Sequence, residues 1–199
     1  MKDKILEKAQ ELFLNLGFKS VTMDEIANSL GISKKTLYKE YINKTNLVSS
    51  VVNFMFDTVC VSIDEISKQK MNPIDELFHI KRIVMEYLKD EKSSPLYQLQ
   101  KYYPKIYSSL KEKQFEVMQE TFQDNLKRGV QAGIFRKDID IDFISRIYFN
   151  GATGIKDQRL FPLQNYAMNT LMNLFLDYHL RAIITPLGLE QLKNQQQYN

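Results

Sequence analysis

The sequence predicts an all-α protein with a small N-terminal helical domain and a larger C-terminal one. Three observations predict this class. Apolar residues recur at helical spacing along most of the 199 residues, no stretch alternates as a strand would, and three closely spaced helix starts near the N-terminus share one capping design. We expect the two domains to cover residues 1–46 and 47–199.

The first helix is predicted over residues 4–16, with Gly17 behind it as a C-terminal cap. Its apolar positions recur at helical spacing, so this helix is expected to support a core. These positions are Ile5, Ala9, Leu12, Phe13 and Leu16.

Two short helices follow in quick succession. Thr22 and Glu25 form a capping box at the first, and Ser33 is the N-cap of the second. Gly31 stands in the turn between them, where a positive φ is tolerated without steric cost. Two short helices joined by such a turn are typical of a helix-turn-helix. The expected hydrophobic staples are Val21 with Ile26, Ile32 with Leu37 and, at a third start capped by Asn43, Ile42 with Leu47.

The second of these helices concentrates positive charge. Between Gly31 and Leu47 there are four lysines and one carboxylate, that of Glu40, although the whole chain has a net charge of only +3. Binding to DNA is therefore expected through this local patch rather than through overall basicity. The candidates for contacts with base edges are Lys34, Lys35, Thr36 and Lys39.

The segment from about Ile5 to Val51 resembles the N-terminal domain of the TetR family of bacterial transcriptional regulators. The resemblance is carried by Gly17-Phe18, Thr22, Ile26-Ala27, Gly31-Ile32-Ser33, Thr36-Leu37-Tyr38 and Lys44. It implies that Thr22, Tyr38 and Lys44 contact phosphates, since hydroxyl and ammonium groups are suitable donors. Glu40 stands where the family often has His, and a carboxylate is unfavourable near phosphates unless it accepts a hydrogen bond from a cytosine N4 amino group. The resemblance therefore implies the fold but not the base preference. The full expected DNA-binding set is Thr22, Lys34, Lys35, Thr36, Tyr38, Lys39, Tyr41 and Lys44.

A long helix is predicted over residues 44–68, which contain no Pro or Gly and would extend about 37 Å. It is expected to run from the DNA-binding domain into the second domain. Two later helices are predicted to begin at Asn72-Pro73 and at Ser94-Pro95, the second with a kink near residues 101–103. Another is predicted over residues 111–132, closed by Gly133, and the next begins after a cap at Asp140 or Asp142. A last long helix is predicted over residues 163–184, and the tail at 191–199 is expected to fray.

The middle helices are rich in aromatic residues and Met, for which two interpretations stay open. Such side chains ordinarily fill a core, but buried phenols need hydrogen-bond partners that a bound ligand could supply. The candidate lining of a site for a small apolar or amphipathic effector is Phe54, Met55, Thr58, Phe78, His79, Tyr87, Tyr97, Tyr103, Phe115, Met118 and Phe122.

Small residues lie among large apolar ones near Gly151. Glycine costs about 1 kcal/mol inside a helix, so its presence there indicates close helix approach. The resemblance implies that the family's dimeric four-helix bundle lies here. The expected dimer seam is Phe143, Ile147, Gly151, Ile155, Leu171, Phe175 and Tyr178.

Other classes of site lack a signal in the sequence. His79 and His179 have no metal-site spacing around them and are expected to be partly exposed helix residues. Cys60 is the only cysteine, which excludes an intramolecular disulfide and suits a reducing cytoplasm. We also expect that no apolar run approaches the roughly 18 residues of a membrane span. No cofactor or metal is expected.

The sequence therefore predicts a cytoplasmic, homodimeric DNA-binding regulator. It is expected to repress by binding a palindromic double-stranded operator and to be released by a small effector. Two alternatives remain at this stage: the same regulator controlled by a protein partner, and an all-helical enzyme, for which no catalytic cluster is recognisable.

Overall fold

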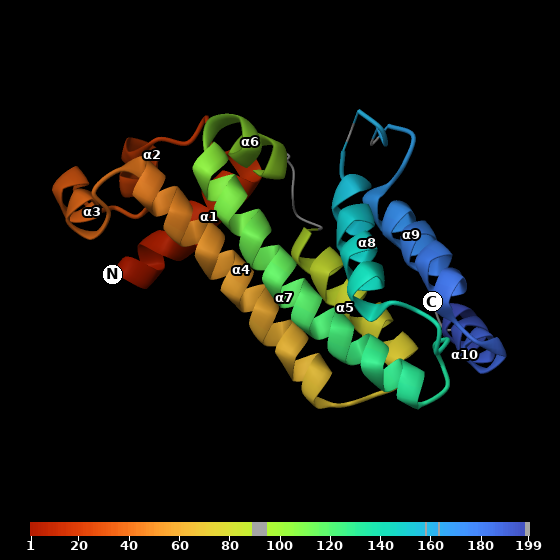
Figure 1. Cartoon of the computed structure of the whole chain (residues 1–199). Coiled ribbons are helices and arrows are strands. Elements are labelled where there is room, and N and C mark those ends of the chain that lie inside the picture. Colours follow the sequence, from red (N-terminus) through yellow and green to blue (C-terminus); the bar gives the residue numbers. More distant parts are fainter. Residues whose placement is uncertain (89–94, 158, 163, 198–199) are drawn as a thin grey trace. The chain divides into compact units, whose positions relative to one another are not determined.

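The computed structural model describes residues 1–88, 95–157, 159–162 and 164–197, and the predicted all-α class is confirmed. Among these residues every regular element is an α-helix, and an isolated antiparallel bridge joins Phe135 to Ile184. The helices in Figure 1 are α1 (Lys2–Leu16), α2 (Met23–Ser29), α3 (Lys34–Glu40), α4 (Lys44–Lys68), α5 (Pro73–Leu88), α6 (Pro95–Tyr102), α7 (Pro104–Gln131), α8 (Ile141–Gly154), α9 (Met168–Ile183) and α10 (Pro186–Gln197).

The chain folds as two compact units. Unit 1 consists of Met1–Val61 and Glu86–Lys113, and unit 2 of Ser62–Met85 and Gln114–Asn199. In unit 1 the first three helices share one hydrophobic core with residues of α4, α6 and α7, because helices this short cannot enclose a core alone. The expected domain boundary between residues 46 and 47 stays a prediction.

The predicted caps of the first helices are present. Thr22 and Glu25 form a reciprocal capping box, and the Ser33 hydroxyl accepts a hydrogen bond from the backbone N–H of Thr36. The Asn43 side chain accepts one from the N–H of Asn46 at the start of α4. Gly31 has a φ of 63°, as the turn between α2 and α3 requires. Figure 1 shows α2 and α3 beside the N-terminal end of α4, so these local signals position the helix-turn-helix.

Two apolar residues expected to pack near these helices are instead exposed. Ile42 is 78% exposed, so the staple with buried Leu47 does not form. Leu16 is exposed as well, because the chain turns away at Gly17 and the buried stripe of α1 ends at Phe13. The core of unit 1 closes without either side chain.

The long helix α4 begins and ends where predicted, but the expectation about membrane spans was wrong. An 18-residue window of α4 has a mean hydropathy of 1.4, so by length and composition this helix could cross a membrane. The reason is that its polar residues are mostly uncharged Ser, Thr and Asn. A single such helix argues only weakly for a span, and Leu47, Val48 and Val51 of its first half are buried in the core of unit 1.

Several predicted helix limits need correction. Pro104 does not kink a helix but begins α7, which continues without a break past residue 111 to Gln131. The segment predicted to fray forms most of α10, where Leu192 is fully buried and Gln191 accepts a hydrogen bond from Asn72. The last long helix begins at Met168 rather than near residue 163. The expected start at Ser94, residue 163 itself and residues 198–199 lie outside the described residues.

Local signals in unit 2 are otherwise confirmed. Asn72 accepts a hydrogen bond from the N–H of Ile74 at the start of α5, and Asp140 accepts one from the N–H of Phe143 at the start of α8. Gly133 has a φ of 72°, and the N–H of Ile134 donates to the carbonyl of Gly129, as a Schellman motif requires.

A buried ion pair joins α5 to α7 in unit 2. Nη2 of Arg128 lies 2.6 and 2.7 Å from the two carboxylate oxygens of Glu76, whose side chain is inaccessible to solvent. Nδ2 of the buried Asn125 donates to the same carboxylate at 3.0 Å. Each oxygen of Glu76 thus has at least one donor, which offsets the cost of burying the charge.

Candidate functional site

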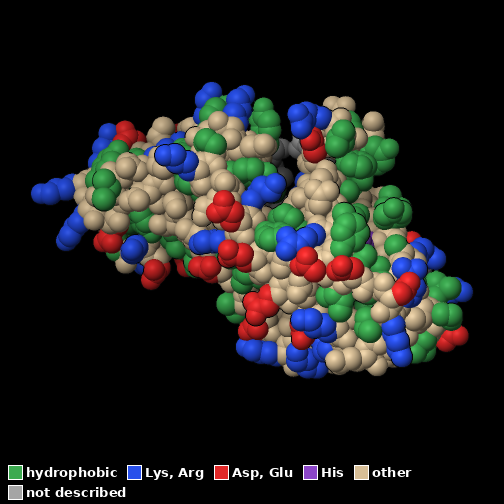
Figure 2. Space-filling view, viewed as in Figure 1, with side chains coloured by type: hydrophobic (Ala, Val, Ile, Leu, Met, Phe, Trp, Pro, Cys, Tyr) green, Lys and Arg blue, Asp and Glu red, His purple; other side chains and the backbone are tan. Residues whose placement is uncertain are grey.

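Helix α3 presents a basic face to solvent. Leu37 is fully buried and fixes the helix against the core of unit 1, while Lys35, Tyr38 and Lys39 are exposed. Figure 2 shows Lys and Arg side chains projecting from the end of unit 1 that carries α2 and α3. The arrangement suits a helix that reads DNA, because the anchoring residue and the charged residues lie on opposite faces.

The lysines of α3 differ in their surroundings. Nζ of Lys34 lies 2.6 Å from Oδ2 of Asp24 on α2, and this hydrogen bond raises the pKa of the lysine. The contact holds Lys34 toward α2, although an ion pair this exposed contributes little to stability. Within the described residues, Lys35 and Lys39 have no carboxylate at ion-pair distance. They are therefore the cations of α3 most available to nucleic acid.

Thr22 and Lys44 lie at the N-terminal ends of α2 and α4, but both already have protein partners. Oγ1 of Thr22 donates to Oε2 of Glu25 at 3.0 Å, and the backbone N–H of Thr22 lowers the pKa of that carboxyl. Nζ of Lys44 donates to the carbonyl oxygen of Lys19 at 3.1 Å, and burial lowers its pKa. To contact a phosphate, the Thr22 hydroxyl or the Lys44 ammonium group must therefore share its hydrogen bond with the present partner or break it.

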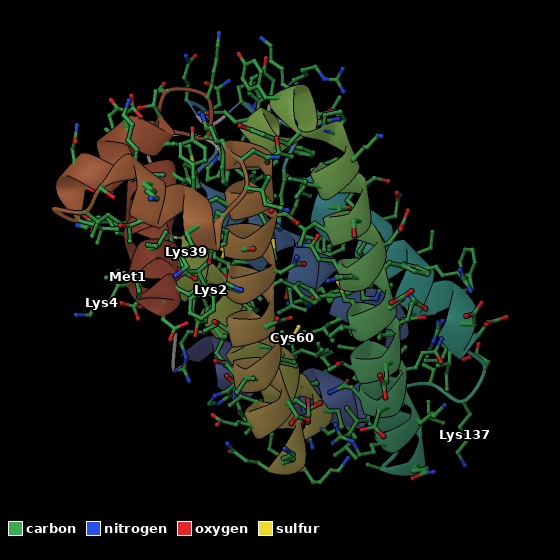
Figure 3. The ribbon with its side chains drawn as sticks, turned by 90° about the vertical axis from the view of Figure 1, so that its left-hand side faces the viewer. Met1, Lys2, Lys4, Lys39, Cys60 and Lys137 are labelled. Atoms are coloured by element: carbon green, nitrogen blue, oxygen red, sulfur yellow. The ribbon has the colours of Figure 1, made fainter. Side chains whose placement is uncertain are left out.

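Tyr41 belongs to the expected DNA-binding set, but its side chain is buried and therefore not available to DNA. Its side chain is only 3% exposed and belongs to the core of unit 1, and burial is the main cause of its raised pKa. Nζ of Lys2 lies 5.8 Å from the centroid of its ring. Figure 3 shows Lys2, Lys4 and Lys39 on the same side of unit 1, so the start of α1 adds positive charge to this side.

The expected effector lining does not form one group of residues, because its members belong to both units. Met55 and Tyr103 pack on the core of unit 1, whereas Phe78, Met118 and Phe122 belong to that of unit 2. The members in unit 1 are Phe54, Met55, Thr58, Tyr87, Tyr97 and Tyr103, and those in unit 2 are Phe78, His79, Phe115, Met118 and Phe122.

Several of these residues have surroundings that do not suit a buried lining. Phe54, Tyr87 and Tyr97 are exposed to solvent. Nδ1 of His79 lies 2.8 Å from Nη2 of Arg82, one turn further along α5. Phe115 packs edge-on against Phe149 with ring centroids 5.1 Å apart. Of the expected residues, Phe122 is the one with a buried aromatic environment.

His179 was expected to be partly exposed, and this expectation was wrong. Its side chain is 4% exposed, its Nε2 atom has no hydrogen-bond partner, and burial lowers its pKa to about 4. It packs among aromatic rings of α7, α8 and α9. The sequence does hold a signal for this, because Met172, Leu176, His179 and Ile183 lie at helical spacing on the buried face of α9.

The buried imidazole makes stability depend on pH. Because the pKa falls from an ordinary 6.5 to about 4, the unfolded chain binds more protons than the folded chain between these values. We predict that the contribution of His179 to the free energy of unfolding is constant above pH 6.5 and decreases by about 3 kcal/mol as pH falls to 4. Urea denaturation of His179→Phe between pH 4 and 7.5 should show this pH dependence removed. Equal pH dependence in the variant and the original chain would contradict the prediction.

The expected dimer seam separates into two groups. Phe143, Ile147 and Tyr178 are exposed, and so is Leu174, which the expected set lacked. In Figure 2 hydrophobic side chains gather over α8 and α9. Their outward faces therefore form an apolar surface, which we call the α8/α9 face and define by Phe143, Ile147, Leu174 and Tyr178.

The other members of the seam pack α8 against α9 within the chain. Ile155 and Leu171 are buried in one cluster, and Phe175 packs on it. A Cβ atom at Gly151 would lie 2.2 Å from the ring of Phe175, so this glycine allows close approach of the two helices of one chain. Gly151, Ile155, Leu171 and Phe175 therefore make contacts inside unit 2, and their expected role in the dimer seam stays a prediction.

A family model described as bacterial regulatory proteins, tetR family, matches residues 5–51. The HTH-type transcriptional repressor KstR2 of Mycolicibacterium smegmatis is 26% identical over 151 residues, which cover 73% of this chain and 72% of the relative. The biofilm operon icaADBC HTH-type negative transcriptional regulator IcaR of Staphylococcus aureus is 39% identical over 57 residues, covering 29% of this chain and 31% of the relative. These relatives are transcriptional regulators rather than enzymes.

Solved structures share the fold. SmeT, the repressor of the Stenotrophomonas maltophilia multidrug efflux pump SmeDEF, has a TM-score of 0.71 at 15% identity, covering 94% of this chain and 91% of that chain. A SmeT-triclosan complex has a TM-score of 0.67, also at 15% identity, and covers 93% and 92% of the two chains. At these identities the likeness concerns the fold alone.

Proposed function

We propose that this chain is a DNA-binding transcriptional repressor of the TetR type, which acts in the cytoplasm as a homodimer on a palindromic operator. The proposal is supported by the family model that matches residues 5–51 and by the similarity to the repressors KstR2 and IcaR. We further propose that a small apolar or amphipathic effector bound in unit 2 releases it from DNA. The observation that carries the DNA-binding part is helix α3, with Leu37 anchored in the core and Lys35, Tyr38 and Lys39 facing solvent.

Within the DNA-binding surface we assign different roles to different residues. Lys35 and Lys39 are proposed to reach base edges, since they have no ion-pair partner among the described residues and lysine pairs well with guanine O6 and N7. Thr36 and Lys34 remain candidates, although the hydroxyl of Thr36 contacts Ser33 and Lys34 contacts Asp24. Thr22, Tyr38 and Lys44 are proposed to contact phosphates.

A homodimer supplies what one recognition helix lacks. Two copies of α3 that face successive major grooves, about 34 Å or a multiple apart, would double the contacts with a palindrome. The α8/α9 face supports this proposal, because an exposed apolar surface of four large side chains indicates an interaction site. We therefore propose that the α8/α9 face is the dimer interface.

The proposed effector response rests on unit 2. Its core contains a buried imidazole and a buried phenol beside aromatic rings, and these are the kinds of polar group that orient small ligands in apolar sites. SmeT, a regulator with the same fold, has been solved as a complex with triclosan. Control by a protein partner is the alternative. Mass spectrometry of the purified protein under native conditions would favour the effector if a small molecule copurifies.

The DNA-binding roles are tested by single lysine substitutions. Lys44→Ala should reduce the slope of log affinity against log salt by about one and weaken binding to all sequences alike, because one phosphate contact is lost. Lys35→Ala should instead change the preferred base at one position, at a cost of about 1–3 kcal/mol. Affinity would be measured by fluorescence anisotropy on an operator selected from random DNA.

Lys137→Ala is the matched control, because it removes the same charge from the loop between α7 and α8 and should leave both the slope and the preference unchanged. If Lys44→Ala changed only base preference, or Lys35→Ala changed only the salt slope, the assigned roles would be wrong.

A further inference from the structure

We propose that His179 is the polar anchor of the effector site in unit 2, and that this site takes a neutral, flat, apolar molecule with one hydroxyl group. The inference rests on the proposed effector response and goes beyond it by naming the anchoring residue and the chemical class of the ligand. It is carried by the surroundings of the imidazole and by two buried polar atoms that lack partners.

Aromatic side chains from three helices surround His179. The ring centroid of the imidazole lies 5.8 Å from that of Phe122 on α7, 5.1 Å from that of Tyr148 on α8 and 5.9 Å from that of Phe175 on its own helix α9. Phe122 and Tyr148 stack face to face, with centroids 4.1 Å apart and planes 9° apart. Flat apolar molecules pack well against such surfaces.

The Nε2 atom of His179 is buried and has no hydrogen-bond partner. Buried polar atoms in folded proteins are paired in the great majority of cases, and an unpaired one is costly, so each exception calls for an explanation. A phenylalanine at this position would fill similar space without that cost. Retention of a histidine is explained if Nε2 gains its partner when a ligand binds.

A second buried atom without a partner belongs to the same helix as Phe122. It is Nε2 of Gln119, which is three residues before Phe122 on α7. The other amide atom of Gln119 accepts a hydrogen bond from the hydroxyl of Ser145 at 2.7 Å, and Ser145 is three residues before Tyr148 on α8. Since residues three apart share a helix face, Gln119 and Ser145 lie on the faces of α7 and α8 that carry Phe122 and Tyr148. Two unpaired polar atoms thus lie on helix faces that contribute to one aromatic cluster.

The groups around His179 are uncharged, and such an environment favours a neutral ligand. Burial lowers the pKa of His179 to about 4 and raises that of Tyr148 to about 12, so both groups are uncharged near pH 7. Among the described residues, Tyr148 is the titratable group in ring contact with His179, and the cation–π contacts of the chain involve other rings than those of Phe122, Tyr148 and Phe175. A hydroxyl group can donate to an imidazole nitrogen or accept from it, so it fits either tautomer.

The test uses two probes of the same shape, 1-naphthol and 1-methylnaphthalene, which differ by a hydroxyl in place of a methyl group. Calorimetric titration of the full chain should give about tenfold tighter binding of 1-naphthol, since one buried hydrogen bond is gained. His179→Phe should bind both probes with equal affinity. Gln119→Met should reduce the preference for 1-naphthol about threefold, and this variant tests the site if His179→Phe does not fold. Gln131→Met, at an exposed position on the same helix, should keep the tenfold preference.

Three outcomes would overturn the inference: neither probe binds the original chain, both bind it equally, or His179→Phe keeps the preference. If neither probe binds, the unpaired atoms would instead form hydrogen bonds with buried water. Operator binding is measured on the same preparation without probe, so a failure of the proposed function is recognised separately. A chain that binds operator but shows no hydroxyl preference refutes only the site at His179.

Discussion

Arg128→Met should lower the free energy of unfolding by about 3–5 kcal/mol. The guanidinium lies 2.6 and 2.7 Å from the two oxygens of Glu76, and the Glu76 side chain is inaccessible to solvent. Methionine occupies similar space but removes the charge and the donors. Among the described residues, the buried carboxylate would then keep the hydrogen bond from Asn125 as its side-chain partner. Urea denaturation at pH 7, followed by far-UV circular dichroism, measures the loss.

The control for this prediction is Arg136→Met. Arg136 also has a carboxylate neighbour, Asp138 at 3.4 Å, but both side chains are largely exposed. Exposed pairs contribute little, so the control should lie within about 0.5 kcal/mol of the original chain. The double variant Glu76→Leu with Arg128→Met should recover much of the loss, because it buries no unpaired charge. Equal losses in Arg128→Met and Arg136→Met would show that the buried pair has no special role.

Sequence signals that act over a few residues were reliable predictors of the fold. Thr22, Ser33 and Asp140 cap helices because each needs only a backbone N–H three residues later, and Gly133 ends α7 because the turn needs its positive φ. These signals positioned α3 and therefore the exposed Lys35 and Lys39. That is why the position of α3 and the exposure of its lysines were predictable, while their contacts with DNA stay a prediction.

The features that were missed depend on residues distant in the sequence. Glu76 and Arg128 are 52 positions apart, and no local pattern pairs them. Tyr41 is buried because unit 1 closes around it, although its neighbour Ile42 is exposed. His179 is surrounded by rings of three helices, which helical spacing alone does not bring together. The residues of the proposed effector site and of the α8/α9 face were accordingly less predictable than the exposed lysines of α3.

Leu174→Glu should dissociate the proposed dimer and weaken operator binding by about 10²-fold or more. Leu174 is 59% exposed on α9 within the α8/α9 face, so a glutamate there costs the folded monomer little. In a dimer related by a two-fold axis, both copies would bury this charge in an apolar interface without a partner. Loss of the dimer removes the gain from binding two half-sites at once, a gain of about 10²–10⁴ in linked binding modules.

Val61→Glu is the matched control, because Val61 is an apolar residue of similar exposure on α4, outside the α8/α9 face. It should leave the dimer and the operator affinity unchanged. Sedimentation equilibrium measures the association, and anisotropy on full and half operators measures the affinity. For Leu174→Glu the full and half operators should bind alike, since a monomer uses one half-site at a time. A stable Leu174→Glu dimer that still prefers the full operator would mean that the copies associate through another surface.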